Sequence, residues 1–336
     1  MYRYLSATSY GTGGAPASTV AEQVFSNTPA VEPMARQNVD NPAETTNSVV
    51  VGLDGSGCAR HAAEWAAAEA SHRHCDLELV FAYHLPPAGS SGYNPYPPHL
   101  LADLRADGAA VLSDTTAALH RQYPGLAIRT TLSYGDPTTV LRHASGSASL
   151  TVVGTHGRSR VTVALGSVAA SVAATSPSPV AVIHPGATNR NGPVVVGVDG
   201  SPNSRAAMSY AFQAAADRHA TLIAVHCWTD PSIDGPVPAY SAAIVDPDAI
   251  RIQEQHILDA ELADLISKYS SVHVKQAVVH DRPEAGLLGF SRTAQLIVAG
   301  SHGHRGLTGL LLGSTTQALI AHSTCPVVIA RPAIKS

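Results

Sequence analysis

The chain carries the same sequence pattern twice. The segment VVVGLDGS at residues 49–56 returns as VVVGVDGS at 194–201, and GTHG at 154–157 returns as GSHG at 300–303. The offsets are 145 and 146 residues, so the landmarks recur in the same order at nearly constant spacing. A repeat of this kind indicates a tandem duplication of one domain. The fold of the chain is therefore expected to be one domain fold, used twice.

The duplication divides the 336 residues into a tail and two domains. Residues 1–46 are rich in Ser, Thr, Pro and Ala and show no sustained hydrophobic period, which predicts a disordered tail. A translation start at Met34 is an alternative account of this segment. The two domains are expected at 47–185 and 193–332, with a short polar linker between them.

Within each copy, aliphatic segments alternate five times with helical ones. The strands are short and β-branched, as expected for strands buried on both faces, and the segment after the first strand repeats Ala with helical spacing. This alternation predicts an α/β fold in which helices cover both faces of a parallel, Rossmann-like sheet. The expected strands are 49–53, 77–83, 126–132, 150–153 and 180–183 in the first copy, and 194–198, 222–228, 272–279, 296–299 and 327–330 in the second.

Composition excludes several classes of protein. A formal charge of −4 leaves no basic excess, so neither a nucleic acid nor a membrane surface is expected as a partner. The chain has no apolar run of the ~20 residues that a membrane helix needs, and its first residues lack a signal-peptide pattern. The four cysteines form no CxxC pair, which favours reduced thiols and a cytoplasmic location. The histidines form no HExxH motif, so no metal site is expected.

The second copy has a distinctive glycine spacing after its fourth predicted strand. Gly300, Gly303, Gly313 and Ser314 form the pattern G-x2-G-x9-G-S. In open α/β sheets ligands bind beyond the carboxyl ends of the strands, where glycines let backbone amides approach a pyrophosphate. We expect Ser314 to be the N-cap of the last helix, whose free N–H groups favour a phosphate. Asp199, at the end of the first strand of this copy, is expected to bind adenine or ribose.

Both copies resemble the universal stress protein domains of the UspA type, and together they resemble the tandem form of that family. The resemblance rests on VVVGVDGS, VAGSHGHRGLTGLLLGS and CPVVIARP in the second copy and on their counterparts in the first. It implies two adenine nucleotide alpha hydrolase-like domains, each a five-stranded parallel sheet of order 3-2-1-4-5. It also implies pairing through the last strands, and hence a homodimer, and it implies ATP as ligand, with or without Mg²⁺.

Carried over residue by residue, the resemblance implies the same kind of nucleotide site in each copy. In the second copy the Cys227 contact would use backbone atoms, because the family more often has an aliphatic residue there. In the first copy the loop between the last two glycines has eight residues instead of nine, which we expect to change how it meets the following helix. Nucleotide binding by that copy is therefore left open. The implied residues are Asp199, Cys227, Gly300, Gly303, Gly313, Ser314 and Thr315 in the second copy, and Asp54, Ala82, Gly154, Gly157, Gly166, Ser167 and Val168 in the first.

Three functions remain compatible with the sequence. The first is an ATP-binding regulatory protein in stress response or growth arrest, with no catalytic residues. The second is a slow ATPase, although the chain lacks a GxxxxGK motif and none of its three lysines lies beside the glycine loop. The third is a nucleotide-free module whose sheets serve for dimerisation. The sequence leaves open whether the nucleotide is ATP or cyclic AMP, and which protein partner or stress is involved.

Overall fold

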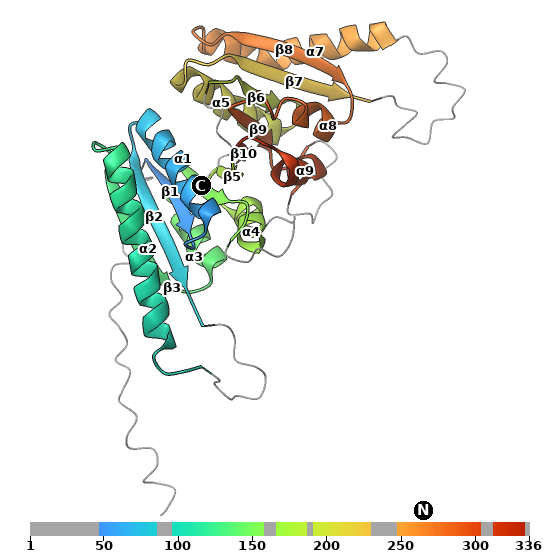
Figure 1. Cartoon of the computed structure of the whole chain (residues 1–336). Coiled ribbons are helices and arrows are strands. Elements are labelled where there is room, and N and C mark those ends of the chain that lie inside the picture. The colour runs from blue at the N-terminus through green and yellow to red at the C-terminus, as the bar shows by residue number, and fades with distance from the viewer. Residues whose placement is uncertain are drawn as a thin grey trace, which may run out of the picture. The chain divides into compact units, whose positions relative to one another are not determined.

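The computed structural model describes residues 47–85, 96–157, 166–186, 191–229, 247–303 and 312–332 (Figure 1). Each copy is an α/β domain in which strands and helices alternate, as the sequence predicts. The predicted disordered tail, Met34 and residues 187–190 of the linker lie outside the described residues.

The elements of the two copies correspond one to one, except in their loops. In the first copy they are β1 (Ser48–Leu53), α1 (Gly57–His72), β2 (Asp76–Tyr83), α2 (Leu100–Gln122), β3 (Ile128–Tyr134), α3 (Pro137–Ala144), β4 (Leu150–Gly154), α4 (Ser167–Thr175) and β5 (Val180–Ile183). In the second they are β6 (Val194–Gly197), α5 (Pro202–Asp217), β7 (Leu222–Trp228), α7 (Pro247–Lys268), β8 (Val274–His280), α8 (Pro283–Leu288), β9 (Leu296–Gly300), α9 (Ser314–His322) and β10 (Val327–Ala330).

The strands of both copies belong to one sheet. Its order is β3-β2-β1-β4-β5-β10-β9-β6-β7-β8, so each copy contributes its strands in the order 3-2-1-4-5. All pairs within a copy are parallel. The copies meet where β10 pairs antiparallel with β5, with Val328 opposite Ala181. The two five-stranded sheets expected from the sequence are thus joined edge to edge into ten strands.

The third strand of each copy begins two residues later than the sequence predicts. The expected first residues, Leu126 and Val272, are buried, but they lie in the turn before the strand. Their N–H groups donate to the carbonyls of Tyr123 and Tyr269 at 3.1 and 3.0 Å. These hydrogen bonds form the turn that joins the end of each helix to the strand that follows. A buried apolar residue in a turn has the same hydrophobic signature as the first residue of a strand, and this made the sequence-based start wrong.

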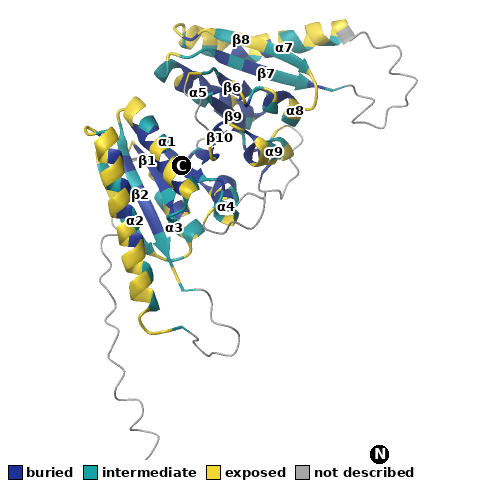
Figure 2. Cartoon of the chain, in the orientation of Figure 1, coloured by how far each residue is buried: buried dark blue, intermediate teal, exposed yellow. Residues whose placement is uncertain are grey.

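Helices cover both faces of the sheet in each copy. Along β1, Val49 and Val51 pack in the core beneath α1, whereas Val50 packs on the opposite side with residues of α3 and α4. This alternation follows from the two-residue period of a strand. Figure 2 shows the buried residues concentrated in the central strands, while the outer sides of α2 and α7 are exposed. The predicted Ala face of α1 is fully buried at Ala62 and Ala66.

Glycine at the end of the fourth strand allows a helix to pack closely on the sheet. A Cβ atom added to Gly300 would lie 2.8 Å from Cβ of Asn203 and 2.9 Å from its carbonyl carbon, and one added to Gly154 would lie 3.0 Å from the backbone of Cys58. Backbone this close leaves no room for a side chain. These two glycines, which were expected to cradle a nucleotide, therefore allow α1 and α5 to pack closely against the ends of β4 and β9.

The residue after the last strand of each copy holds the last helix of the other copy. Arg331, after β10, donates through Nη1 to the carbonyl of Ser176 at 2.7 Å and through Nη2 to those of Ala173 and Ala174. His184, after β5, donates through Nε2 to the carbonyl of Ile320 at 2.8 Å. The last carbonyls of a helix have no partner within the helix, so these side chains cap the C-terminal turns of α4 and α9 across the interface between the copies.

Replacing Arg331 tests this cross-capping. Arg331→Met keeps the aliphatic stem but leaves the α4 carbonyls without their donors, and we expect the free energy of unfolding to fall by about 1–3 kcal/mol. Urea titration of the full chain followed by circular dichroism measures the change. Arg205→Met is the matched control, because Arg205 is exposed and its pair with Glu261 lies at the surface. Equal midpoints for the two variants would contradict the capping role.

Candidate functional site

A tight turn follows the first strand of the first copy. The N–H of Ser56 donates to Oδ1 of Asp54 at 2.9 Å, and Gly55 between them has a φ of +80°, in the left-handed region that favours glycine. The Ser56 hydroxyl then accepts the N–H of Ala59 at 3.1 Å and caps α1. The DGS sequence is therefore one local unit that ends the strand, turns the chain and starts the helix.

The second copy builds the same turn from the same residue types. The N–H of Ser201 donates to Oδ1 of Asp199 at 2.9 Å, Gly200 has a φ of +78°, and the Ser201 hydroxyl accepts the N–H of Ser204 at 3.1 Å. The N–H of Asp199 donates in turn to the Ser204 hydroxyl at 3.1 Å. Part of the role of each aspartate is therefore local. In the sequence, this local role is indicated by the serine two residues after each aspartate, which caps the following helix.

The other carboxylate oxygen of each aspartate, Oδ2, faces the glycine loop. A Cβ atom added to Gly303 would lie 2.5 Å from Oδ2 of Asp199, and one added to Gly157 would lie 2.7 Å from Oδ2 of Asp54. Both distances are shorter than any normal contact between nonbonded atoms. A side chain at either position would therefore have to push the carboxylate away from its place. The structure thus brings together Asp199 with Gly303, and Asp54 with Gly157, as the sequence predicts for one site in each copy.

The two ends of the glycine loop are tied together in the same way in both copies. The N–H of Gly166 donates to the carbonyl of Thr155 at 2.8 Å, and that of Gly313 donates to the carbonyl of Ser301 at 2.9 Å. The expectation that the shorter first loop meets its helix differently is wrong. These hydrogen bonds hold the two ends of the loop together in the same way in both copies, and residues 158–165 and 304–311 between them lie outside the described part of the chain.

The last helix of each copy begins on the loop glycine. Gly313 is the N-cap of α9, since its carbonyl accepts the N–H of Gln317 at 2.9 Å, and Ser314 is the first helical residue. The prediction of Ser314 as the N-cap is wrong, because the bond from Gly313 to Ser301 places the glycine at that position. Among the residues that the structure describes, no side chain caps the amino end of α4 or α9. The first N–H groups of each helix have no partner within the helix and point toward its amino end.

The copies differ at the first turn of this helix. Thr316 is buried, and its hydroxyl donates to the carbonyl of Gly300 at 2.7 Å, which ties α9 to the end of β9. The corresponding residue of the first copy is Ala169, which has no hydroxyl. Thr316 was not predicted as a site residue, and its only signal in the sequence is a polar residue on an otherwise apolar helix face. Ser167 and Ser314 are exposed on this turn, and Val168 and Thr315 are half-buried.

The predicted residues on the second strand of each copy lie at its carboxyl end. Ala82 is opposite Ser133 in the sheet and half-buried. The Cys227 thiol points toward α8, where a Cβ atom added to Gly286 would lie 2.6 Å from Sγ. Burial, with Asp281 and Glu284 adding negative charge nearby, raises the pKa of Cys227 to about 11, so the thiol is protonated at neutral pH. The side chain therefore packs against a helix, which leaves its backbone atoms for any ligand.

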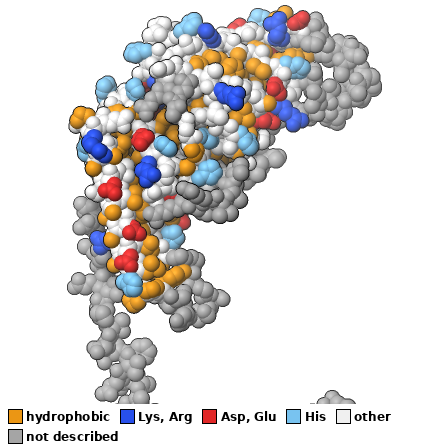
Figure 3. Space-filling view, viewed as in Figure 1, with side chains coloured by type: hydrophobic (Ala, Val, Ile, Leu, Met, Phe, Trp, Pro, Cys, Tyr) orange, Lys and Arg blue, Asp and Glu red, His pale blue; other side chains and the backbone are white. Residues whose placement is uncertain are grey.

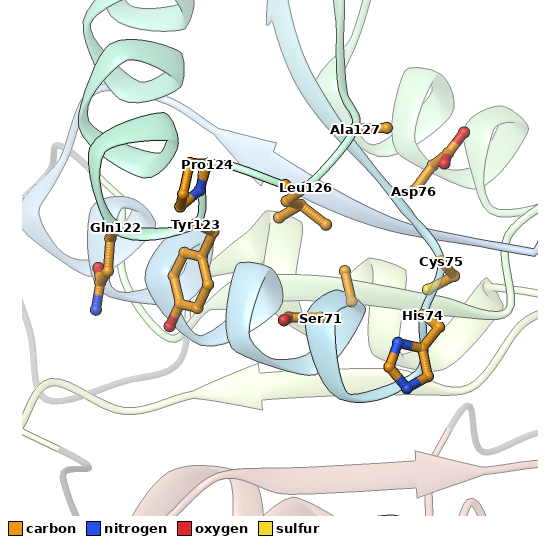
Figure 4. Close-up of a pocket in the computed structure, with 11 residues that line it drawn as sticks. Ser71, His74, Cys75, Asp76, Gln122, Tyr123, Pro124, Leu126 and Ala127 are labelled. Atoms are coloured by element: carbon orange, nitrogen blue, oxygen red, sulfur yellow. The ribbon is translucent and has the colours of Figure 1, made fainter.

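A cavity of about 570 Å³ lies in the first copy, at the opposite edge of the sheet from Asp54 and Gly157. Figure 4 shows Gln122, Tyr123 and Pro124 on one wall and His74 and Cys75 on the other. These residues precede β2 and β3, so the cavity opens at the amino ends of the parallel strands. Ligands of open α/β sheets bind at the carboxyl ends, so this cavity is separate from the predicted nucleotide site.

Charged side chains of both signs are mixed on the face of the molecule that Figure 3 shows. On the face shown in Figure 3, Lys and Arg side chains are scattered among neutral and acidic ones. In the described part of the chain, no helix is both long and apolar enough to cross a bilayer. The same residues contain no group of three or more His, Cys, Asp and Glu side chains placed to hold a metal ion.

Comparison with known proteins gives one consistent family. The model of the Universal stress protein family matches residues 45–184 and 191–331. A universal stress protein of Mycobacterium tuberculosis is 34% identical over 295 residues, and the match covers 85% of this chain and 97% of that protein. A universal stress protein of Mycolicibacterium smegmatis is 32% identical over 300 residues, and the match covers 86% of this chain and 98% of that protein. The crystal structure of a universal stress protein from Archaeoglobus fulgidus has the same fold, with a TM-score of 0.62 at 20% identity, covering 85% of this chain and 96% of that one. This chain therefore belongs to the universal stress protein family and carries two of its domains in tandem.

Proposed function

We propose that this protein binds ATP at the carboxyl edge of its sheet, in the second copy and in the first, and acts as a regulatory protein. One observation carries the proposal. In each copy the aspartate turn, both ends of the glycine loop and the amino end of the last helix meet at one place, and Oδ2 of Asp199 lies against Gly303 without room for a side chain. Membership of the universal stress protein family supports a role in stress response.

The chemistry of this convergence suits a nucleotide with phosphates. The first N–H groups of α9, which have no partner within the helix, and the positive end of its dipole attract negative charge. The glycine loop lets backbone amides approach phosphate oxygens, while the carboxylate of Asp199 provides an acceptor for a ribose hydroxyl or the adenine amine. Because the first copy ties its loop and helix together in the same way, we extend the proposal to Asp54, Gly157 and Gly166.

The site is better suited to binding than to turnover. The lysines are Lys268, Lys275 and Lys335, and none adjoins the glycine loop in the sequence, although phosphoryl transfer usually employs such a residue. We therefore propose that ATP, with or without Mg²⁺, acts as a ligand that stabilises one arrangement of the copies. A slow ATPase is the second candidate, and it would require turnover that is lost in a loop variant.

The proposal includes a cytoplasmic location and a homodimer. All four cysteines are free thiols, as a reducing compartment would keep them. The last strands, through which the family resemblance implied pairing, already pair with each other within this chain. A homodimer would therefore form through another surface.

Release of bound nucleotide tests the proposed function. We expect the purified protein, when denatured, to release adenine nucleotide that chromatography identifies as ATP or cyclic AMP. After removal of bound ligand, ATP at 100 times its dissociation constant should stabilise the fold by about 2.7 kcal/mol, measured as a rise in melting temperature. If no nucleotide is released and ATP leaves the melting temperature unchanged, the protein is a nucleotide-free module and the proposal fails.

Alanine at the loop glycines assigns binding to each copy. In Gly303→Ala the new Cβ would displace the carboxylate of Asp199, and we expect ATP binding by the second copy to weaken at least about tenfold, which is about 1.4 kcal/mol. Gly157→Ala makes the same change in the first copy, so calorimetric stoichiometry of the single and double variants separates the sites. Gly125→Ala is the control, since no atom lies within 4 Å of its added Cβ. Unchanged affinity in the double variant would place the nucleotide elsewhere. ATPase activity that persists after ATP binding is lost would come from a contaminant.

Cys227 tests whether the second strand contributes its backbone or its side chain. Because the thiol faces Gly286, we expect Cys227→Val to change ATP affinity less than about threefold, which is about 0.6 kcal/mol. The measurement is calorimetric titration of ATP into the variant and the unmodified chain, with circular dichroism to confirm that both are folded. A loss as large as that of Gly303→Ala would show that the side chain touches the ligand.

A further inference from the structure

The carboxyl ends of α1 and α5 meet across the interface between the two copies. Arg73 is the C-cap of α1 and Arg218 is the C-cap of α5, and the two arginines are equivalent residues of the repeat, 145 positions apart. Each is followed by a histidine with positive φ, His74 at +50° and His219 at +49°. The repeat therefore places the same cation at the end of the same helix in both copies.

One carboxylate lies between these arginines. Glu69 of α1 accepts from Nε of Arg73 through Oε1 at 2.6 Å, and its Oε2 accepts from Nη2 of Arg218 of the other copy. Nη2 of Arg73 donates to the hydroxyl of Tyr210 on α5 at 2.5 Å. The side chain of Glu69 is 2% exposed, that of Arg218 8% and that of Arg73 17%. Two hydrogen-bonded links thus cross the interface in opposite directions.

Among the residues that the structure describes, Glu69 is the only carboxylate paired with these two arginines. Two guanidinium groups held this close with little access to water would repel each other without an anion between them. The negative ends of the two helix dipoles offset part of the excess positive charge. Burial raises the pKa of Tyr210 to about 12, so at neutral pH its hydroxyl is an uncharged acceptor and does not replace the carboxylate. Loss of Glu69 would therefore leave Arg218 buried without an ionic partner.

The second copy does not supply this carboxylate. The residue equivalent to Glu69 is Ala214, on the same turn of α5 before Arg218, and the carbonyl of Ala214 accepts from Nη1 of Arg218 at 3.1 Å. If two second copies paired through the same surface, two Arg218 side chains would face each other across two alanines. Pairing with the first copy instead gives Arg218 a carboxylate.

We propose that Glu69 is a specificity determinant of this interface, so that the second copy pairs with a domain of the first-copy type and rejects another second copy. The partner surface it fits is an α1 helix end that presents a glutamate one turn before a C-cap arginine. The β5 to β10 pairing provides contact but little discrimination, because it joins backbone groups and aliphatic side chains on both sides. The inference does not depend on nucleotide binding.

Moving the carboxylate within the full chain tests the proposal. We expect Glu69→Ala to lower the melting temperature by about 5–10 °C and to raise the radius of gyration in small-angle scattering as the copies separate. Adding Ala214→Glu to this variant returns one carboxylate to the equivalent turn of α5, within reach of the same two arginines. We expect this double variant to regain at least half of the lost melting temperature and the original radius of gyration.

Controls separate the position of the charge from its presence. Glu64→Ala removes an exposed glutamate from α1, and Ser209→Glu adds one at an exposed position of α5. Glu64→Ala should behave as the unmodified chain, and Ser209→Glu should not rescue Glu69→Ala. Glu69→Gln, which keeps the shape, is measured if Glu69→Ala fails to fold. A lower melting temperature with an unchanged radius of gyration, or equal rescue by Ser209→Glu and Ala214→Glu, would overturn the proposal.

Discussion

The antiparallel pairing of β5 with β10 is the constraint on which the other contacts between the copies depend. It joins two parallel five-stranded sheets into one and brings the last helix of each copy beside the chain that leaves the last strand of the other. Arg331 and His184 then reach the free carbonyls of those helices. Burial lowers the pKa of His184, so its ring is neutral near pH 7 and donates through one nitrogen, whereas Arg331 offers several donors. The same structural position is thus filled by different chemistry in the two copies.

The glycines of the candidate site divide into three kinds with different physical reasons. Gly154 and Gly300 are required because a helix backbone packs against them, which would hold with or without a ligand. At Gly157 and Gly303 a side chain would displace the carboxylate that lies against them, and Gly166 and Gly313 close the loop with a backbone hydrogen bond. Only the second and third kinds of contact organise the edge at which we propose ATP to bind. A motif read as one phosphate-binding unit is therefore partly a packing motif.

Departures from exact repetition are informative because the two copies share one backbone plan. Thr316 against Ala169, and Glu69 against Ala214, each add a polar group in one copy at a buried position. Buried polar groups are costly unless they are hydrogen-bonded, so each has to have a partner. Thr316 finds it within its own copy at the carbonyl of Gly300, and Glu69 finds it partly in the other copy at Arg218. The duplication has thereby diverged at the site and at the interface.

The sequence by itself determined the duplication, the alternation of strands and helices, and the turns that follow the first strand of each copy. These features are local: periodic burial marks a strand or helix, and Asp-Gly-Ser specifies a turn and a cap without help from distant residues. It failed at the start of β3 and β8, where a buried apolar residue in a turn resembles the first residue of a strand, and at the N-cap of α9, where the N–H of Gly313 donates to the carbonyl of Ser301 across the loop. Only the tertiary structure decided that Gly300 packs on Asn203, that Oδ2 of Asp199 faces Gly303, and that Glu69 meets Arg218. These contacts join residues about 100 or more positions apart, and their geometry is set by how helices pack on a shared sheet, which spacing along the chain does not encode.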